Sequence, residues 1–328
     1  MNRPAFLSWP ARRLALAAPA AAGLALAAAV IPAGTASAAP ASGSLPAAEI
    51  AFQANTGALW TWVDGSSSDL GLGMAAGTSP SVNDDGEIAF QANTGALWAA
   101  KPGYYGLDLG LGMAKGTSPG IDDDGEIAFQ ANTGHLWQAK PGYYGRDLGL
   151  GMRAGTSPSI NDPSPFTASG EIAFQGPHGY LWEAKPGYYG TDTGLPMRAG
   201  TSPSIDDNGD VAFQGPHGYL WASESGYGTG NTGLGMMAGT SPSLSRSEGG
   251  GTDGEIAFQA NTGYLWTWTP GGGGYDTGLK MAAGTSPSID IFGDVAFQGS
   301  NGHLWITGPG GTFDLGLGMA PDTSPSIN

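Results

Sequence analysis

Apolar and polar positions alternate within a short phrase that recurs along the chain. Residues 50–60 and residues 88–98 both read IAFQANTGALW. In an extended strand successive side chains point to opposite faces, so Ile and Phe share one face while Ala and Gln share the other. The tripeptide NTG supplies a tight turn, because its glycine adopts a positive φ without strain. We therefore predict a β-hairpin, with strands at residues 87–92 and 96–100 in the second copy.

The remainder of each copy predicts two more strands. In the second copy these are residues 107–113 (LDLGLGM) and 117–121 (TSPGI), and a Pro/Gly loop at residues 101–106 precedes them. The turn at residues 122–125 (DDDG) leads into the next copy. After residue 38 no segment spaces its apolar residues at the helical period, so almost no helix is expected.

Seven copies fill the chain after its first 48 residues. Each copy spans about 40 residues, a period typical of a propeller blade or a solenoid unit. Four antiparallel strands in each repeat favour the propeller. We predict an all-β fold over residues 49–328, a seven-bladed β-propeller of four-stranded antiparallel blades. The copies begin at Glu49, Glu87, Glu126, Glu171, Asp210, Glu255 and Asp294.

The two ends of the repeat region predict how the ring closes. The first copy begins at Glu49 without a clear TSPSI segment before it, whereas the chain finishes with TSPSIN at residues 323–328. The C-terminal strand can therefore complete the first blade, which leaves no open sheet edge at the junction. One alternative stays open, because SGSLPA at residues 42–47 is a possible degenerate local copy of the missing strand.

The first 38 residues predict a secretory signal peptide. A basic segment with Arg12 and Arg13 precedes an Ala/Leu-rich apolar segment, and small residues lead to a cleavage site after Ala38. The arginine pair leaves both Sec and twin-arginine export open. Residues 39–48 then form a short linker, and the mature protein is expected to be secreted.

Charge and composition narrow the classes of partner. The chain has 12 basic and 28 acidic residues, and the predicted signal peptide removes three of the basic ones. Such an acidic surface repels phosphate groups, which argues against nucleic acids and against insertion into anionic membranes. The chain has no cysteine, so disulfides and thiolate metal sites are excluded. No cofactor is predicted.

Tryptophan and glutamine recur at one position each in all seven copies. The tryptophans are interpreted either as spacers between blades or as flat platforms for the C–H face of a sugar. The glutamines are interpreted either as donors of interblade hydrogen bonds or as partners of sugar hydroxyls. The candidate binding residues are Trp60, Trp98, Trp137, Trp182, Trp221, Trp266 and Trp305, with Gln53, Gln91, Gln130, Gln175, Gln214, Gln259 and Gln298.

Tyrosines in the repeated KPGYYG segment are a second group of candidates. Aromatic side chains in exposed loops are often used for binding. The antiparallel order of the strands places this loop on the same face of the propeller as the NDDG-type turns. Tyrosines that fold back on the blade are the alternative. The candidates are Tyr105, Tyr144 and Tyr189.

The remaining polar motifs predict neither catalysis nor metal binding. The acidic turns are too short to surround a calcium ion and are interpreted as hairpin turns. The four histidines do not recur with a serine or a carboxylate as a catalytic triad requires, and none pairs at metal-ligand spacing. The axis-lining TSPS segments carry no acid/base pair, so an enzyme is the least favoured class.

The order of these motifs resembles the repeat of bacterial seven-bladed β-propeller lectins of the PLL-like family. The resemblance covers residues 49–328 and implies carbohydrate binding at sites repeated between blades. A glutamine follows the Phe of every copy, where family members carry a basic residue, so the bidentate donor of an arginine is missing at that position. The matching residues, which have equivalents around the chain, include Leu70-Gly71, Ser79-Pro80, Asp85-Gly86, Phe90 and Gly95-Ala96-Leu97-Trp98.

The sequence thus predicts a secreted, multivalent lectin that binds glycans of a cell surface or of a polysaccharide. A propeller scaffold for a protein partner or for the cell envelope is the main alternative, and an extracellular hydrolase or lyase is less favoured. The identity of the sugar, the number of working sites and the oligomeric state are left open.

Overall fold

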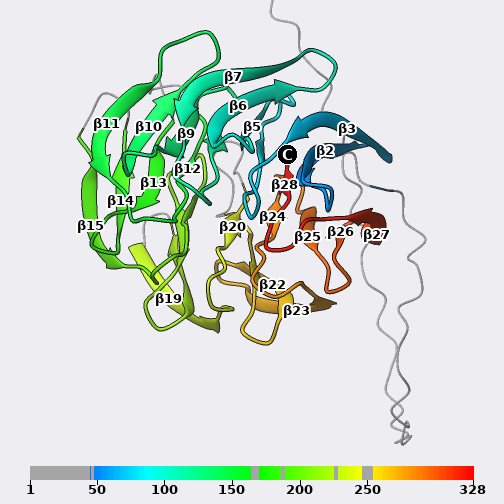
Figure 1. Ribbon diagram of the computed structural model, residues 1–328. Helices are drawn as coiled ribbons and strands as arrows, with labels where there is room; N and C mark the ends of the chain where they lie inside the picture. The colour runs from blue at the N-terminus through cyan, green and yellow to red at the C-terminus, as the bar shows by residue number, and fades with distance from the viewer. Residues whose placement is uncertain (1–44, 46–47, 164–169, 186–188, 225–227, 246–253) are drawn as a thin grey trace, which may run out of the picture. The chain divides into compact units, whose positions relative to one another are not determined.

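The computed structural model describes residues 45, 48–163, 170–185, 189–224, 228–245 and 254–328. Within them all regular secondary structure is β-strand, arranged as seven four-stranded antiparallel sheets around one axis (Figure 1). The predicted seven-bladed propeller is confirmed. The predicted signal peptide, residues 1–38, lies outside the described residues.

The blades are numbered in chain order, and the strands of each are given from the axis outward. Blade 1 consists of β28 (Ser326–Ile327), β1 (Glu49–Gln53), β2 (Ala58–Val63) and β3 (Ser66–Gly73); blade 2 of β4 (Ser81–Val82), β5 (Ile88–Gln91), β6 (Ala96–Lys101) and β7 (Tyr105–Gly112); blade 3 of β8 (Gly120–Ile121), β9 (Ile127–Gln130), β10 (His135–Ala139) and β11 (Arg146–Gly151); blade 4 of β12 (Ser159–Ile160), β13 (Ile172–Gln175), β14 (Tyr180–Ala184) and β15 (Thr191–Pro196). Blade 5 consists of β16 (Ser204–Ile205), β17 (Val211–Gln214), β18 (Tyr219–Glu224) and β19 (Gly228–Gly235); blade 6 of β20 (Ser243–Leu244), β21 (Ile256–Gln259), β22 (Tyr264–Thr269) and β23 (Gly273–Lys280); blade 7 of β24 (Ser288–Ile289), β25 (Val295–Gln298), β26 (His303–Gly308) and β27 (Gly311–Gly318).

The strand bounds differ most from the prediction at the innermost and outermost strands. The innermost strand of blade 2 has two residues, Ser81–Val82, because the preceding Thr-Ser-Pro segment bends instead of pairing. The outermost strand, β7, begins at Tyr105, so the turn of the KPGYYG segment is confined to residues 102–104. Tyr105 was predicted to lie in a loop, and that prediction is wrong: the strong pairing between β6 and β7 extends to Lys101 and Tyr105.

The ring closes through the C-terminal strand, as predicted. β28 pairs with β1, with Ile327 opposite Ile50 and Ser326 opposite Ala51. The last strand of the chain thus supplies the innermost strand of the first blade, and every blade has the same four strands. No sheet edge is left unpaired at the junction between the chain's two ends.

Serine side chains link the blades around the axis. The backbone N–H of each serine of the TSP motif donates to the hydroxyl of the equivalent serine in the next blade at 2.9 Å, and Ser324 donates back to Ser79, so the ring of hydrogen bonds is closed. A second set, at 3.0–3.3 Å, joins the inner-strand serines to the following blade, as when Ile121 N–H donates to the Ser81 hydroxyl.

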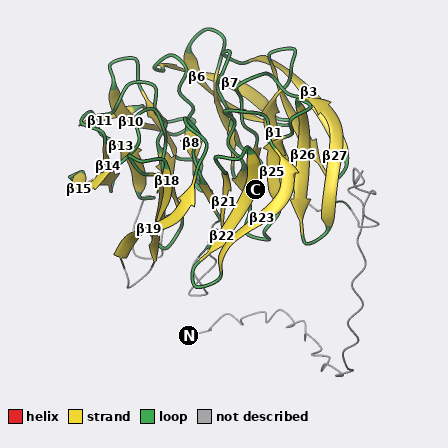
Figure 2. Ribbon diagram, turned by 90° about the horizontal axis from the view of Figure 1, so that it is seen from below, coloured by secondary structure: helices red, strands yellow, loops and turns green. Residues whose placement is uncertain are grey.

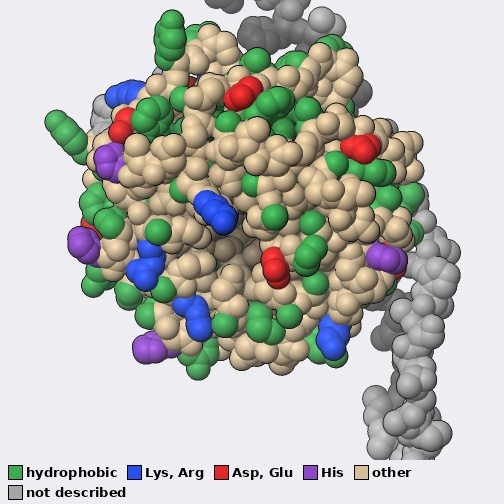
Figure 3. Space-filling view, viewed as in Figure 1, with side chains coloured by type: hydrophobic (Ala, Val, Ile, Leu, Met, Phe, Trp, Pro, Cys, Tyr) green, Lys and Arg blue, Asp and Glu red, His purple; other side chains and the backbone are tan. Residues whose placement is uncertain are grey.

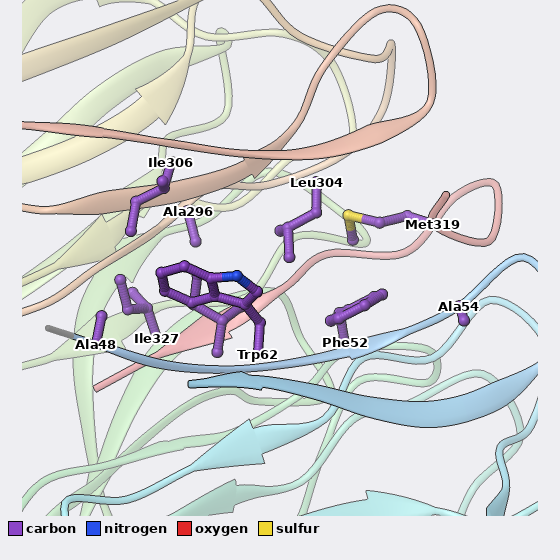
Figure 4. Close-up of a cluster of buried hydrophobic side chains, with 10 residues drawn as sticks. Ala48, Phe52, Ala54, Trp62, Ala296, Leu304, Ile306, Met319 and Ile327 are labelled. Carbon is purple, nitrogen blue, oxygen red and sulfur yellow. The ribbon is translucent and has the colours of Figure 1, made fainter. Parts of the chain in front are cut away.

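The hydrophobic core lies between blades. Figure 4 shows the cluster in which Phe52 and Trp62 of blade 1 face Ala296, Leu304 and Ile306 of blade 7. Equivalent clusters fill the other six interfaces, and the Phe of the second strand is at most 1 % exposed in every blade. Burying large apolar side chains from both neighbours holds adjacent sheets together.

The propeller has two faces with different turns. We call one the NTG face: it carries the turns between second and third strands, such as residues 93–95, and the connections between blades. We call the other the NDDG face: it carries the turns between first and second strands, such as residues 83–86, and the turns at KPGYYG. Figure 2 shows these loops gathered at the ends of the strands.

Candidate functional site

The seven tryptophans lie on the third strand of each blade, near the NTG face. All seven are half-buried. Each ring packs against the Phe of its own blade, with ring centroids 6.0–6.5 Å apart. Each also packs against the outer strand of the preceding blade, as Trp98 does against Leu70 and Leu72. The ring is therefore both a spacer between blades and partly open to solvent.

Each tryptophan and its neighbouring NTG-type turn meet the outer strand of the preceding blade. We call this line of contact a seam. Each seam is named by its two blades, so that Trp98 lies at seam 1/2 and Trp60 at seam 7/1. Figure 3 shows the NTG face, which is recognised by its histidines because these residues follow or occupy the turns of that face. The histidines lie near the periphery, and basic side chains lie between them.

The residue after the repeated glutamine divides the seams into two classes. It is Ala in blades 1, 2, 3 and 6, and Gly at positions 176, 215 and 299 in blades 4, 5 and 7. A Cβ at any of these three glycines would overlap the indole of its own blade. The indole occupies that space and lies flatter against its Phe, with interplanar angles of 26–39° instead of 46–50°.

The indole nitrogens also differ between blades. Those of Trp60, Trp98, Trp137, Trp182 and Trp266 are buried and have no hydrogen-bond partner among the residues that the structure describes. The nitrogen of Trp305 donates to Asn301 Oδ1 at 3.1 Å. Trp221, whose ring stacks on Phe213 at 26°, belongs to neither group.

The seven glutamines are buried beneath the seams. Each Nε2 donates to a carbonyl of the connection that leads to the next blade, at 2.8–3.1 Å. In blade 1 the acceptor is Ala75, whose carbonyl also accepts from the Thr78 hydroxyl. This arrangement matches the interpretation of the glutamine as an interblade donor. Contact between a glutamine and a ligand stays a prediction, and the burial of these side chains does not favour it.

The candidate tyrosines lie on the NDDG face, away from the tryptophans. Tyr105 donates from its hydroxyl to Glu87 Oε1 at 3.1 Å, and burial together with the Glu87 carboxylate raises the pKa of Tyr105 to about 12. Tyr144 and Tyr189 are almost fully exposed, at 100 % and 97 %. The structure thus separates the predicted site residues into two groups on opposite faces.

An acidic position that the sequence analysis missed lies directly opposite each tryptophan. The residue on the outer strand that pairs with the tryptophan is exposed in all seven blades, and its Oδ1 accepts from the backbone N–H two residues later at 2.8–2.9 Å. Its recurrence nine or ten residues after every tryptophan was the available signal. The residues are Asp69, Asp108, Asp147, Asp192, Asn231, Asp276 and Asp314.

Histidines join this acidic position in two blades. His135 Nδ1 lies 3.1 Å from Asp147 Oδ2, and His303 Nδ1 lies 3.0 Å from Asp314 Oδ1. Desolvation raises the pKa of the Asp147 carboxyl, but hydrogen bonds from Gly149 N–H and from His135 outweigh it, so that pKa is lowered on balance. The carboxylate stays ionised and accepts hydrogen bonds at neutral pH.

Two arginines reach the seams from the connections between blades. Arg153 and Arg198 follow the last methionine of blades 3 and 4, where the other connections have Ala or Met. Their Nη1 atoms lie over the turns of the next blade. A Cβ added at Gly179 would lie 3.1 Å from Arg153 Nη1, and a Cβ added at Gly218 would lie 2.8 Å from Arg198 Nη1. Neither arginine could be predicted as a site residue from the sequence, because a single basic residue in a connection shows no repeat.

The turns of the NDDG face are stabilised by their own side chains. In blade 3 Asp122 Oδ1 accepts from Glu126 N–H at 2.7 Å, and in blade 2 Asn83 Oδ1 accepts from Glu87 N–H at 2.8 Å. These contacts match the hairpin-turn interpretation of the acidic segments. The described residues contain no cluster of three or more His, Cys, Asp or Glu suited to hold a metal ion.

A cavity of about 560 Å³ lies on the axis, lined by the Pro-Ser-Ile segments of the inner strands. Its lining also includes Asp84 and Asp290. The TSPS segments themselves carry no acid/base pair, as predicted, but the turns after β4 and β24 bring these two carboxylates into the lining of the cavity. Burial raises the pKa of Asp290, and the nearby Asp84 adds to that effect. Asp290 Oδ1 caps its own turn by accepting from Phe292 N–H and Asp294 N–H.

Comparison with known proteins identifies the fold alone. No family model matches the chain, and no curated protein matches it. A solved structure of the SapL1 lectin in complex with alpha methyl fucoside is similar, with 16% identity and a TM-score of 0.51, over 76% of this chain and 98% of that one. The GH74 enzyme of Niastella koreensis is also similar, with 10% identity and a TM-score of 0.50, over 85% of this chain and 42% of that one.

In the described part of the chain no helix is long and apolar enough to cross a membrane.

Proposed function

We propose that the protein is a secreted, multivalent carbohydrate-binding protein whose sugar sites lie at the seams of the NTG face. One observation, repeated in all seven blades, carries the proposal. In every blade a half-buried tryptophan pairs across the strands with a residue whose carboxylate or amide is exposed. A flat ring packs on the C–H face of a sugar, and a carboxylate accepts strong hydrogen bonds from its hydroxyls. The fold shared with a lectin supports this function at the level of architecture.

The repetition explains why individually poor sites are useful. A monosaccharide site is often no better than millimolar, about −4 kcal/mol. Several such sites on one face can engage a dense glycan surface together, which raises avidity by roughly 10²–10⁴ without new contacts. Seven seams on one face of a rigid ring suit this mode of binding.

Secretion is the part of the proposal that depends on sequence alone. The predicted signal peptide, the absence of cysteine and the excess of acidic residues are compatible with an exported protein that acts on glycans outside the cell. Fractionation of the producing cells tests it, because the expected product is extracellular and begins near residue 39.

Titration of the purified protein with a panel of neutral monosaccharides tests the sugar sites. We expect a change in tryptophan fluorescence at millimolar sugar and a calorimetric stoichiometry above one. Asp108→Ala should remove one site from that stoichiometry, since its carboxylate faces Trp98 at seam 1/2. Tyr104→Ala, a matched exposed position on the NDDG face, should leave the stoichiometry unchanged.

An absence of binding to every sugar in the panel up to about 50 mM would refute the proposal, because even a weak lectin site saturates in that range. The scaffold interpretation would then replace it.

A further inference from the structure

One seam lacks the aspartate that lies opposite the tryptophan at the other six. Blade 5 has Asn231 opposite Trp221, where every other blade has an aspartate opposite its tryptophan. Asn231 keeps the local role of that aspartate, because its Oδ1 still accepts from Gly233 N–H at 2.8 Å. The substitution therefore removes a negative charge from seam 4/5 and leaves its backbone geometry as in the other blades.

A positive charge lies at the same seam. Arg198 enters from the connection between blades 4 and 5, and its Nη1 lies over Gly218. The Trp221 indole occupies the space beside Gly215, and Gly218 N–H donates to the Gly215 carbonyl at 2.9 Å within one tight turn. The guanidinium and the indole thus contact two ends of the same four-residue turn.

Arg198 has no hydrogen-bond or ion-pair partner for its guanidinium within the residues that the structure describes. The chain has 28 acidic residues against 12 basic ones, so partners are plentiful. Lys185, by contrast, pairs with Glu171 at 3.1 Å. Arg198 is half-buried as a residue, and its positive charge has no partner among the described residues, so the guanidinium is available to an anionic ligand.

We propose that seam 4/5 binds a sugar that bears an anionic group, such as a uronic acid. The inference rests on the proposed carbohydrate-binding function. Arg198 holds the carboxylate through paired N–H donors, for which the planar guanidinium is well suited, and Trp221 packs on the sugar ring. Asn231 offers an amide to the hydroxyls without repelling the anion. The acidic excess of the protein does not prevent this, because charges more than about 8 Å away are screened at physiological ionic strength.

Seam 3/4 provides an internal control. It has the same Gly-Pro-His-Gly turn, with Arg153 over Gly179 and Trp182 beside Gly176, but it retains Asp192 opposite the tryptophan. A carboxylate at that point repels an anionic sugar at short range, so seam 3/4 is expected to favour neutral sugars. The residue opposite the tryptophan is Asp192 at seam 3/4 and its isostere Asn231 at seam 4/5, while the apolar lining is Leu148 and Leu150 at the first seam and Leu195 at the second.

Calorimetric titration with galacturonate, with galactose 6-sulfate and with methyl galactoside tests the assignment. We expect one galacturonate site per chain in the wild-type protein. Arg198→Gln and Asn231→Asp should each weaken it by at least about tenfold, the equivalent of one hydrogen bond to a charged group. Arg146→Gln removes the same charge from strand β11 and should change nothing. Asp192→Asn should add a second galacturonate site at seam 3/4.

The outcomes separate this inference from the proposed function. Binding of methyl galactoside without binding of galacturonate or of galactose 6-sulfate overturns the inference and leaves the function standing. Galacturonate binding that survives Arg198→Gln also overturns it. Binding of the sulfated sugar but not of galacturonate supports an anionic site and corrects the anion. If none of the three sugars binds, the inference fails here, and the broader neutral panel decides the function separately.

Discussion

The axis and the seams of this propeller use the same seven repeats in opposite ways. At the axis every blade has the same serine, and seven hydrogen bonds of 2.9 Å form a closed ring. At the seams the tryptophan is constant, but its neighbours change from blade to blade between Asp and Asn, Ala and Arg, or Ala and Gly. Closing a ring requires each blade to turn the chain by the same angle, so axial residues have little freedom. Exposed seam residues are free to differ, and differences there alter what each seam can bind.

Removal of residues 323–328 tests the axis most severely. The deletion takes away β28, the partner of β1, and the Ser324 link in the serine ring. We expect a loss of several kcal/mol in the free energy of unfolding, because Ile327 leaves the core and the β1 edge is exposed. Thermal unfolding followed by circular dichroism measures it. An unchanged transition would mean that the ring is held without its last strand.

Single substitutions should separate stability at the axis from binding at the seams. Ser241→Ala leaves the Ser202 N–H without its acceptor, and we expect a loss of about 1–3 kcal/mol in stability with sugar binding unchanged. Asp108→Ala at seam 1/2 should weaken sugar binding and leave stability unchanged, since the Asp108 carboxylate is exposed and accepts only from Gly110 N–H. Denaturant unfolding and sugar titration on both variants provide the comparison. Equal effects of Ser241→Ala and Asp108→Ala on sugar binding would contradict this separation of stability from binding.

The NDDG face adds a pH dependence to the stability of the ring. Burial raises the pKa of Asp122 to about 7, while its ordinary value in an unfolded chain is about 4. The unfolded carboxyl ionises first as pH rises, so this group's contribution to stability is lost between about pH 4 and pH 7. Asn83, at the equivalent position of blade 2, instead donates from its amide to the Asp122 carbonyl at 2.8 Å.

Asp122→Asn should therefore stabilise the protein at pH 8 by about 1 kcal/mol and have little effect at pH 4. Urea unfolding of both proteins across that range measures the difference. A gain of equal size at both pH values would show that the carboxyl does not titrate as the structure indicates.

The smallest expected effect comes from the one gap in the second set of axial hydrogen bonds. Blade 3 has Gly120 where the inner strands of the other blades have serine, so Ile160 N–H lacks the serine hydroxyl that Ile121 N–H receives from Ser81. A Cβ at Gly120 meets its nearest neighbour, Ile160 Cγ2, at an ordinary 3.4 Å. Gly120→Ser should raise stability by about 0.5–1 kcal/mol, measured as a higher midpoint of thermal unfolding. A lower midpoint would indicate that the inner strand has no room for the side chain.

Much of the fold could be predicted because the local sequence of each repeat determines the secondary structure of that repeat. The alternation around Phe90, the turn at Gly95 and the recurrence of the phrase determine strands and blade count, since these are local properties. The candidate site was harder to predict. Trp98 was predicted as a site residue because it repeats. Asp108 repeats too, but it was missed because an acidic residue beside Leu-Gly in a strand is typical of an ordinary surface position.

The sequence by itself determined the seven blades and their four strands and favoured closure of the ring by the last strand, because periodicity and the order of motifs are properties of a linear chain. Only the tertiary structure decided that the glutamines are buried and that the tryptophans and tyrosines lie on opposite faces. It also placed Arg198 of one connection over the turn that the Trp221 indole packs against, in the blade that carries Asn231. That placement exists because neighbouring blades pack side by side, and it depends on the angle between two sheets, which no single repeat encodes.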